Sequence, residues 1–396
     1  MGEWKQCPLS ELGTIVGGAT PSTKDIENYE NGTISWITPK DLSGYSKRYI
    51  SNGERNITEK GLKSCSTLLM PKNTVLFTSR APIGYVAIAG KELCTNQGFK
   101  SVVPNDDTDF MFLYYLLKYN KGKIESMGSG TTFKEVSGNT MRNIVVSVPV
   151  DKKEQERIGQ FLSSIDEKIE QNNEINSNLE QQAQVIFKSW FVDFENFDES
   201  IVGSWELQKL GNIACFSQGT QVPIEDQLFV PTEGYTRFIR IIDVTQPSNQ
   251  DIRYIKDTKK GKVTSSDIFM IRYGTPGIVA RNYAGIIANN LFKITPTTEK
   301  VTSNYLYHFL KSSDVQNYIT QNAVSSTMPA INFSTLKNLE IIIPDDMTMK
   351  KFSALSEAIR VKQLELSNEN LHLSSIRDTL LPKLMSGEID LSSIDI

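Results

Sequence analysis

Apolar residues recur in alternating steps of four and three along two long stretches of the chain. The first stretch has its repeating positions at Ile158, Leu162, Ile165, Ile169, Asn172, Asn176, Leu179, Ala183, Ile186 and Trp190. This heptad pattern predicts a long helix whose seam faces a second helix, with the two asparagines fixing the register. Asp151 and Glu154, just after Pro149, predict a capping box at its start.

The second stretch shows the same alternation near the end of the chain. Its positions are Phe352, Leu355, Ile359, Lys362, Leu366, Glu369, Leu373, Ile376 and Leu380, and Gly387 suits a left-handed C-cap. Either stretch could instead be an ordinary amphipathic helix of a core. Because the two are similar in length and each ends a block of about 150 residues, a paired helical spacer is favoured.

The blocks before these helices mix short β-branched runs with amphipathic segments. Strands are predicted at Thr74–Phe77, Tyr85–Ile88, Ile144–Val148, Ile239–Ile242 and Leu339–Ile343, and helices at Phe110–Lys118 and Ser303–Lys311. The interleaving lacks regular βαβ spacing, so each block is predicted to be α+β. The order of the strands does not follow from the sequence.

The two blocks match each other in sequence. Trp4, Leu9 and Leu12 recur as Trp205, Leu210 and Ile213, and residues 36–43, 113–118 and 143–149 match residues 238–245, 306–311 and 338–344. Arg80 and Gly84 match Arg272 and Gly277 if one inserted residue is allowed. We therefore predict a tandem duplication with globular domains at 1–150 and 200–344 and helical spacers at 151–199 and 345–396.

Composition and charge refine this division. The 396 residues are 39% hydrophobic and 22% charged, a globular composition that is too long for one ordinary core. The net charge of −4 is divided as +3 for 1–150, −7 for 151–199, +3 for 200–344 and −3 for 345–396. The sequence contains no apolar run long enough to predict a membrane span. It also lacks a basic segment followed by an apolar one at its N-terminus, so secretion is not predicted.

Catalytic motifs are missing from the sequence. There is no Gly-Lys-Ser/Thr phosphate loop, no GxSxG elbow and no HExxH. His308 and His372 are interpreted as surface or packing residues, and the four dispersed cysteines as buried free thiols without a metal. Asp41 and Asp243 recur in both blocks without a carboxylate–lysine cluster around them, which disfavours a nuclease site.

Four marks in a fixed order carry a resemblance to a known family. They are the Trp-x4-Leu-x2-Leu/Ile opening of each half, the Arg-x3/4-Gly segment, the loops 129–132 and 325–328, and the Leu380–Ile389 segment LLPKLMSGEI. Together they make the chain resemble the specificity (S) subunit of type I restriction-modification systems. The resemblance implies two target recognition domains, each reading half of a bipartite, asymmetric DNA site, separated by two antiparallel coiled-coil helices in a pseudo-twofold repeat.

The resemblance also implies a cytoplasmic chain without catalytic activity or a cofactor of its own. Two modification subunits would bind S-adenosylmethionine and methylate adenine in double-stranded DNA. Two restriction subunits, where present, would add a nuclease dependent on ATP and magnesium. No membrane partner is implied.

Candidate contact residues follow from charge and position. Arg80 and Arg272 could bind guanine or phosphate, with a structural salt bridge as the alternative. Phosphate contacts are predicted at Lys47, Arg48, Arg55, Lys134, Arg253, Lys256, Lys259 and Lys260, with solvated loop charge as the alternative. The loops 44–55, 130–135, 246–262 and 326–331 should carry the choice of sequence.

The acidic helices are predicted to bind protein. Phe187, Phe191 and Phe194 could dock the modification subunit, or they could pack on their own domains. A rival hypothesis is a non-enzymatic interaction scaffold that oligomerises through its coiled coil. That scaffold would show no salt-dependent binding of duplex DNA.

Overall fold

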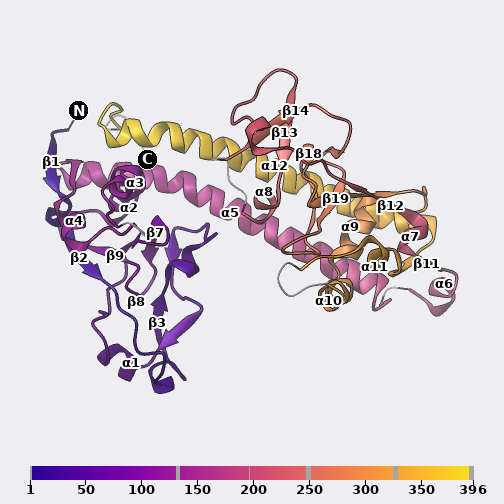
Figure 1. The fold of residues 1–396 in the computed structure, drawn as a ribbon, viewed down its shortest axis with the longest axis horizontal. Helices are drawn as coiled ribbons and strands as arrows, with labels where there is room; N and C mark the ends of the chain where they lie inside the picture. The colour runs from indigo at the N-terminus through magenta and orange to yellow at the C-terminus, as the bar shows by residue number, and fades with distance from the viewer. Residues whose placement is uncertain (1, 131–133, 196, 247–250, 324–328, 392–396) are drawn as a thin grey trace. The chain divides into compact units, whose positions relative to one another are not determined.

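The computed structural model describes residues 2–130, 134–195, 197–246, 251–323 and 329–391. The chain divides into two compact units (Figure 1). Unit 1 comprises Met1–Gln171 with Glu369–Ile396, and unit 2 comprises Asn172–Asn368. Each unit therefore holds one α+β block and a part of both long helices.

The two longest helices are α5, Lys152–Phe191, and α12, Asp346–Met385. The Asp151 carboxylate accepts from the backbone N–H of Lys153 at 3.0 Å, and Asp345 accepts from that of Thr348 at 3.0 Å. Each bond satisfies a donor that the first turn leaves without a helical partner. The second helix thus starts six residues before Phe352, where the sequence pattern had begun.

The block of unit 1 contains three sheets and several short helices. Its elements are β1 Trp4–Pro8, η1 Leu9–Glu11, β2 Gly13–Gly17, η2 Ile26–Asn28, β3 Ile34–Ile37, η3 Pro39–Leu42, β4 Tyr49–Ile50, β5 Arg55–Ile57, α1 Glu59–Lys63, β6 Val75–Ser79, β7 Ile83–Ala89, β8 Cys94–Thr95, β9 Lys100–Pro104, α2 Phe110–Tyr119, α3 Lys121–Ser126, α4 Gly138–Asn143 and β10 Val145–Pro149. The strand orders are β2-β9-β6-β7-β4, β5-β3-β8 and β1-β10.

The block of unit 2 repeats this plan. Its elements are α6 Glu199–Val202, β11 Glu206–Lys209, α7 Leu210–Ile213, β12 Ala214–Gln218, η4 Ile224–Asp226, β13 Tyr235–Ile239, α8 Ile241–Thr245, β14 Arg253–Lys256, β15 Lys262–Val263, β16 Ile268–Ile271, β17 Val279–Ala280, β18 Gly285–Ile287, β19 Leu291–Pro296, α9 Ser303–Lys311, α10 Ser313–Gln321, α11 Phe333–Lys337 and β20 Glu340–Ile343. The strand orders are β12-β19-β16-β17, β14-β13-β18-β15 and β11-β20.

Both blocks close in the same way. The first strand pairs antiparallel with the last, β1 with β10 and β11 with β20. Next to these ladders, Leu9 N–H donates to the Ile144 carbonyl and Leu210 N–H to the Leu339 carbonyl, both at 2.8 Å. The start and end of each block therefore meet just before the long helix that follows. The repeated ladder confirms the duplication.

The helices run antiparallel within each unit. In unit 1, Arg377 of α12 bonds Asp166 of α5 and Asn370 bonds the Ile169 carbonyl. In unit 2, the Gln363 amide bonds the Asn176 carbonyl at 3.2 Å. The residue numbers of the bonded partners rise along α5 and fall along α12. This order confirms the predicted antiparallel arrangement.

The seam of α5 lies where the heptad pattern predicts it, because all ten positions are buried or half-buried. The seam of α12 is only partly correct. Phe352, Ile359 and Leu366 are buried and Leu373, Ile376 and Leu380 are half-buried as predicted, but Leu355, Lys362 and Glu369 are exposed. The alternate positions are the polar residues Ser356, Gln363, Asn370 and Arg377, each buried or half-buried. The apolar pattern misses them because each is held by a hydrogen bond.

The end of α12 and the segment after it complete the core of unit 1. Leu384, Met385 and Leu391 are buried in the cluster that contains α2. Gly387 has φ +74°, and a Cβ there would lie 2.9 Å from the Trp4 indole nitrogen. The predicted left-handed glycine is therefore confirmed, and the close approach of Trp4 adds a second reason for it.

Two smaller predictions were wrong. Residues 239–242 do not continue as one strand, since β13 ends at Ile239 and the helix α8 begins at Ile241. The four cysteines are free, but only Cys7 and Cys94 are buried, whereas Cys215 is exposed. The helices predicted at 110–118 and 303–311 are present as α2 and α9.

Candidate nucleic-acid interface

Three of the predicted phosphate contacts in unit 1 are exposed. Lys47 precedes β4, Arg55 opens β5, and Lys134 lies next to Glu135. Exposure is a necessary condition for contact with a phosphate backbone. Their role in DNA binding stays a prediction.

Arg48 does not fit the predicted role. Its side chain is only 8% exposed and forms a bidentate pair with Glu170 of α5, with both N···O distances at 3.1 Å. A third bond runs from its Nη1 to the Ser163 carbonyl at 2.9 Å. Arg48 thus fastens the loop before β4 to α5, and its guanidinium has no exposed face for a phosphate.

Arg80 shares a carboxylate with a second cation. Its Nη1 lies 3.3 Å from Glu135 Oε2, and Lys100 Nζ lies 3.5 Å from Glu135 Oε1. The Glu135 segment is fixed by two backbone bonds to Ser129, at 3.1 and 2.9 Å. One carboxylate facing two cations leaves a net positive corner, and the Arg80 side chain is 35% exposed there.

Arg272 is not the structural counterpart of Arg80. Gly84 and Gly277 have matching φ values of +95° and +97°. When these glycines are aligned, no residue needs to be inserted between the arginine and the glycine of the second copy. The Val136 N–H donates to the Ser79 carbonyl as the Ile331 N–H donates to that of Arg272. Arg272 therefore corresponds to Ser79, and the equivalence predicted from sequence was wrong by one residue, which reverses the face of a strand.

The guanidinium of Arg272 lies between two aromatic rings. It is 4.9 Å from the ring centroids of both Tyr273 and Phe333. Stacking of this kind stabilises a cation and limits its motion. The side chain is half-buried, so Arg272 keeps a partial access to solvent.

The segment 253–262 of unit 2 is the most basic part of that block, with five Lys/Arg and one Asp. Lys256, Lys259 and Lys260 are exposed. Arg253 is only 15% exposed and binds Asp251 at 2.7 Å. Residues 131–133, 247–250 and 326–328 of the predicted recognition loops lie outside the described residues.

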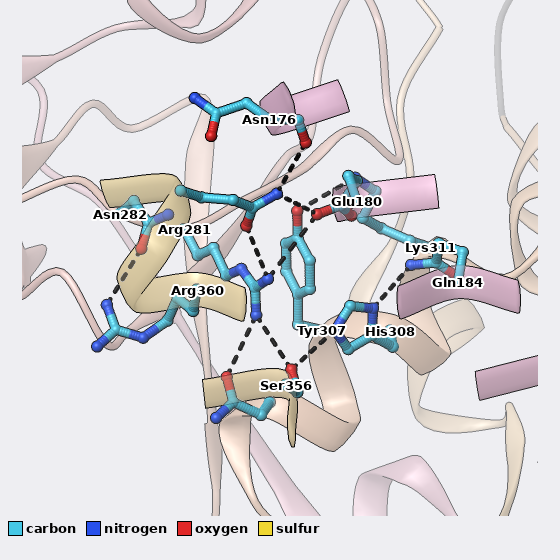
Figure 2. A network of polar contacts seen from close by, with 12 residues as sticks. Asn176, Glu180, Gln184, Arg281, Asn282, Tyr307, His308, Lys311, Ser356 and Arg360 are labelled. Carbon is cyan, nitrogen blue, oxygen red and sulfur yellow. Dashed lines mark hydrogen bonds and ion pairs between the residues drawn. The ribbon is translucent and has the colours of Figure 1, made fainter. Parts of the chain in front are cut away.

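A buried polar network fixes the block of unit 2 to its helices (Figure 2). Arg281, just after β17, is 5% exposed and stacks 3.9 Å over the Tyr307 ring of α9. Its Nη2 donates to Gln363 Oε1 of α12 at 3.1 Å and lies 3.8 Å from Glu180 of α5. Burial lowers the pKa of Arg281. One side chain from the block thereby contacts both helices.

Glu180 is the anion at the centre of this network. It accepts from Lys311 of α9 at 2.5 Å and from the Gln363 amide at 3.2 Å. Burial favours its neutral form, but Lys311 and Arg281 outweigh that effect and lower the pKa of Glu180 to about 2. The carboxylate is therefore charged at neutral pH and paired.

His308 is the neutral residue of this polar network. The Gln184 amide nitrogen can only donate, so Nδ1 of His308 accepts from it at 3.0 Å. Nε2 then carries the proton and donates to Ser356 Oγ at 2.8 Å. Burial, assisted by Arg281, lowers the pKa of His308 to about 3. Both ring nitrogens are satisfied only in the neutral form.

Arg360 of α12 reaches in the opposite direction, into the block. It binds Asn282 Oδ1 at 3.1 Å (Figure 2). It also binds Glu357 on its own helix at 2.6 Å and the Ser265 carbonyl at 3.3 Å. Its hydrogen bond lowers the pKa of Glu357 to about 2. Block and helix are thus bound by arginines from both sides.

Unit 1 has a different network at the matching place. Asp166 of α5 accepts from Tyr115 of α2 at 2.7 Å, binds Arg377 of α12 at 2.5 Å, and has Lys118 at 3.9 Å. Burial opposes its charge, but Lys118 and Arg377 lower the pKa of Asp166. Lys118 and Lys311 occupy matching positions, but Tyr115 stands where unit 2 has His308, so the two networks share the lysine and differ at the neighbouring position.

The three aromatic residues predicted to dock a partner pack on their own unit instead. Phe187 and Phe191 are 2% and 5% exposed within the core of unit 2, against Tyr305 and Phe352. Phe194 is half-buried, with its ring centroid 5.9 Å from that of Trp205. The prediction of partner docking was wrong for Phe187 and Phe191, because their side chains are buried in the block itself. For Phe194 it stays a prediction.

Asp41 and Asp243 have structural roles. Each accepts the backbone N–H three residues earlier, of Thr38 and Arg240 respectively, at 2.7 Å. Their recurrence thus reflects a repeated capping box. Across the described ranges, no group of His, Cys, Asp or Glu is arranged to hold a metal ion.

The network residues Arg281, Glu180 and Arg360 were not found from the sequence. The matched pairs Tyr114–Lys118 and Tyr307–Lys311 were the available signal, since both place a cation one helical turn after a tyrosine. The partner of Lys311 lies 131 residues away and that of Arg281 lies 82 residues away, and a charge pattern read along the chain does not link them.

Comparison with known proteins gives one consistent family. Residues 1–181 and 203–369 match the type I restriction modification DNA specificity domain. The chain is 34% identical to the type I restriction enzyme MjaIX specificity subunit of Methanocaldococcus jannaschii, over 98% of this chain and 94% of that one. It is 23% identical to the HindI specificity subunit of Haemophilus influenzae, over 98% and 100%.

A solved structure shares the fold. The type I restriction-modification system S subunit from M. genitalium aligns with a TM-score of 0.59 at 18% identity, covering 97% of this chain and 96% of that one. Among the described residues, no helix has both the length and the apolar content that crossing a membrane would require.

Proposed function

The chain belongs to the family of type I restriction-modification DNA specificity subunits, and we propose that each of its two blocks reads one half of a bipartite, asymmetric DNA site. The family supplies DNA sequence recognition. The division of that recognition between the blocks is our inference. A protein-interaction scaffold is not favoured by the comparisons.

One observation carries the proposal: each unit contains a copy of the same plan. The orders β2-β9-β6-β7 and β5-β3-β8 recur as β12-β19-β16-β17 and β14-β13-β18, to which unit 1 adds β4 and unit 2 adds β15. The closing ladders β1-β10 and β11-β20, with a long helix after each, also occur in both. Two similar readers whose contact surfaces differ suit two half-sites of different sequence. Each reader gains affinity from the other because binding of the second becomes intramolecular.

The long helices set the separation of the half-sites in this proposal. Helices α5 and α12 have 40 residues each, or about 60 Å at 1.5 Å per residue. Their buried charge networks fix each block to its own stretch of helix. A spacer of this kind lets the number of intervening base pairs be read without contact to their bases.

The chemistry belongs to partner subunits. Two modification subunits, docked on the helices, would bind S-adenosylmethionine and methylate adenine, and two restriction subunits would cut DNA with ATP and magnesium. Residues of this chain would hold the duplex and choose its sequence. The predicted phosphate contacts that are exposed are Lys47, Arg55, Lys134, Lys256, Lys259 and Lys260.

Binding of duplex DNA tests this function. We expect the complex with modification subunits to bind its site tightly, with an affinity that falls steeply as salt rises. The chain alone should bind weakly, since each block carries an excess of only three positive charges. A complex without salt-dependent duplex binding would support the scaffold, and tight specific binding by the chain alone would contradict the need for the complex.

A further inference from the structure

Two large apolar side chains project from the block of unit 2 beside its basic segment. Phe229 is 64% exposed and Val230 is 62% exposed. Their backbone is held in place, because the neighbouring Leu228 exchanges two hydrogen bonds with Tyr254 of β14, at 2.8 and 2.9 Å. Adjacent apolar side chains exposed on an ordered backbone indicate a contact surface.

The Phe229 ring is held by an arginine that is itself fixed. The Arg253 guanidinium lies 3.7 Å from the ring centroid and donates to Asp251 at 2.7 Å. Asp251 also accepts from Arg240 Nη1 at 2.9 Å. Arg253 therefore backs part of the ring while the rest faces solvent. A ring held in this way loses little conformational entropy on binding.

Charge beside the apolar pair indicates the kind of partner. Lys256, Lys259 and Lys260 follow on the same segment and are exposed, and the segment 253–262 carries four more positive than negative charges. Glu225 and Asp226 of η4 lie on the other side in sequence and limit where a phosphate backbone can approach. Apolar groups next to a row of cations match a groove of duplex DNA, with base edges between phosphates.

We propose that Phe229 and Val230 recognise the 5-methyl group of thymine in the half-site read by unit 2, while the lysines of 256–260 contact the flanking phosphates. This inference rests on the proposed function and adds the residues that read bases. Thymine alone presents a methyl group in the major groove, and apolar side chains distinguish it there.

Unit 1 differs after its own 3₁₀ turn η2. Ile26 of η2 is 67% exposed, but the aromatic residue Tyr29 turns inward, with its ring 6.1 Å from that of Trp36 and its hydroxyl donating to the Pro21 carbonyl at 2.6 Å. A side chain that reads sequence should differ between the copies, because the two half-sites differ.

The test uses the full chain in complex with its modification subunits. The methylated motif is identified by sequencing DNA from the co-expressing cells, and a duplex with that motif serves as the probe. Phe229→Ala should weaken binding of the probe about tenfold or more, without changing its salt dependence or the binding of unrelated duplex. Lys256→Ala should instead weaken both duplexes alike and reduce the salt slope by about one.

Replacing single thymines by deoxyuridine removes only the methyl group. The unaltered complex should lose about fourfold in affinity at one or more thymines of the unit 2 half-site. The Phe229→Ala complex should lose nothing further there. Leu207→Ala is the matched control, since Leu207 of β11 is 61% exposed and should leave every affinity unchanged.

Three results would overturn the proposal: wild-type affinity for Phe229→Ala, an equal loss in both half-sites, or no methyl-sensitive thymine in the unit 2 half-site. The two hypotheses fail differently. A wild-type complex without sequence preference would refute the proposed function. A preference that Phe229→Ala leaves intact would refute this inference alone.

Discussion

At the residue scale, the buried Arg281 and the half-buried Glu180 and Lys311 satisfy one another's charges. Removing one partner of such a group leaves the others buried and unpaired, which costs more than the pair contributes. His308 adds a pH-dependent element, because its two nitrogens are matched only while the ring is neutral.

We predict that unit 2 loses stability between pH 7 and pH 5 through His308. Its pKa is lowered to about 3 from an ordinary value of 6.5, so below pH 6.5 the unfolded chain binds a proton that the folded chain does not. The stabilising contribution of neutral His308 is fully present above pH 6.5. The free energy of unfolding falls as pH decreases below that value, by about 2 kcal/mol at pH 5. Urea unfolding at both pH values measures the difference.

The His308→Asn variant should not show this loss of about 2 kcal/mol in unfolding free energy between pH 7 and pH 5, although the variant should be less stable than the unaltered chain at pH 7. Glu180 does not affect the difference in unfolding free energy between pH 7 and pH 5, because the stability that its lowered pKa provides is lost only below pH 4.5. His372→Asn is the control, because His372 is exposed on α12. An unchanged pH dependence in His308→Asn would contradict the assignment.

Arg80 and Arg272 give a second prediction at this scale. Arg80→Ala should weaken one half-site and Arg272→Ala the other, each by about 1–3 kcal/mol if they bind guanine. Footprinting of the complex on its target would show which half-site loses protection. Equal loss of both half-sites, or none, would remove these arginines from the recognition surface.

At the element scale, the sequence predicted best where a periodic apolar pattern decides the structure. Helix α9 has the predicted bounds, and the α5 seam holds at every position. The α12 seam was wrong at three positions because the buried Ser356 and Gln363 form hydrogen bonds with His308 of α9, with Arg281 and with α5, and periodicity does not record such bonds. Strand order was not predictable, since it depends on pairings between distant segments.

The corrected seam of α12 has a direct consequence for stability. Leu366→Ala should destabilise the chain by about 2–5 kcal/mol, because Leu366 is 5% exposed and its removal leaves a cavity. Leu355→Ala should cost less than about 1 kcal/mol, because Leu355 is 38% exposed. Urea midpoints of the two variants measure this, and equal losses would contradict the seam described here.

The candidate interface was only partly predictable at this scale. Arg48, Phe187 and Phe191 had the residue types expected of contacts, but tertiary packing buries all three. The sequence did not predict Phe229 as a contact residue, because a single aromatic residue in an irregular segment usually belongs to a core. Only its exposure and its stacking on Arg253 distinguish it.

At the scale of the whole molecule, the net charge of −4 combines two opposed parts. Each block carries +3, while the segments with the long helices carry −7 and −3. This division suits blocks that approach phosphate and helices that bind protein. The duplication was predictable because its anchors recur in order, and its two copies differ where their recognition surfaces should.

Sequencing of methylated adenines in cells that express this chain with its modification subunits tests the central claim most directly. We predict a modified motif of two specified blocks separated by a fixed number of unspecified base pairs. Exchanging residues 200–344 for those of a relative should change one block and leave the other intact. A contiguous motif, or a change in both blocks after the exchange, would contradict two independent readers.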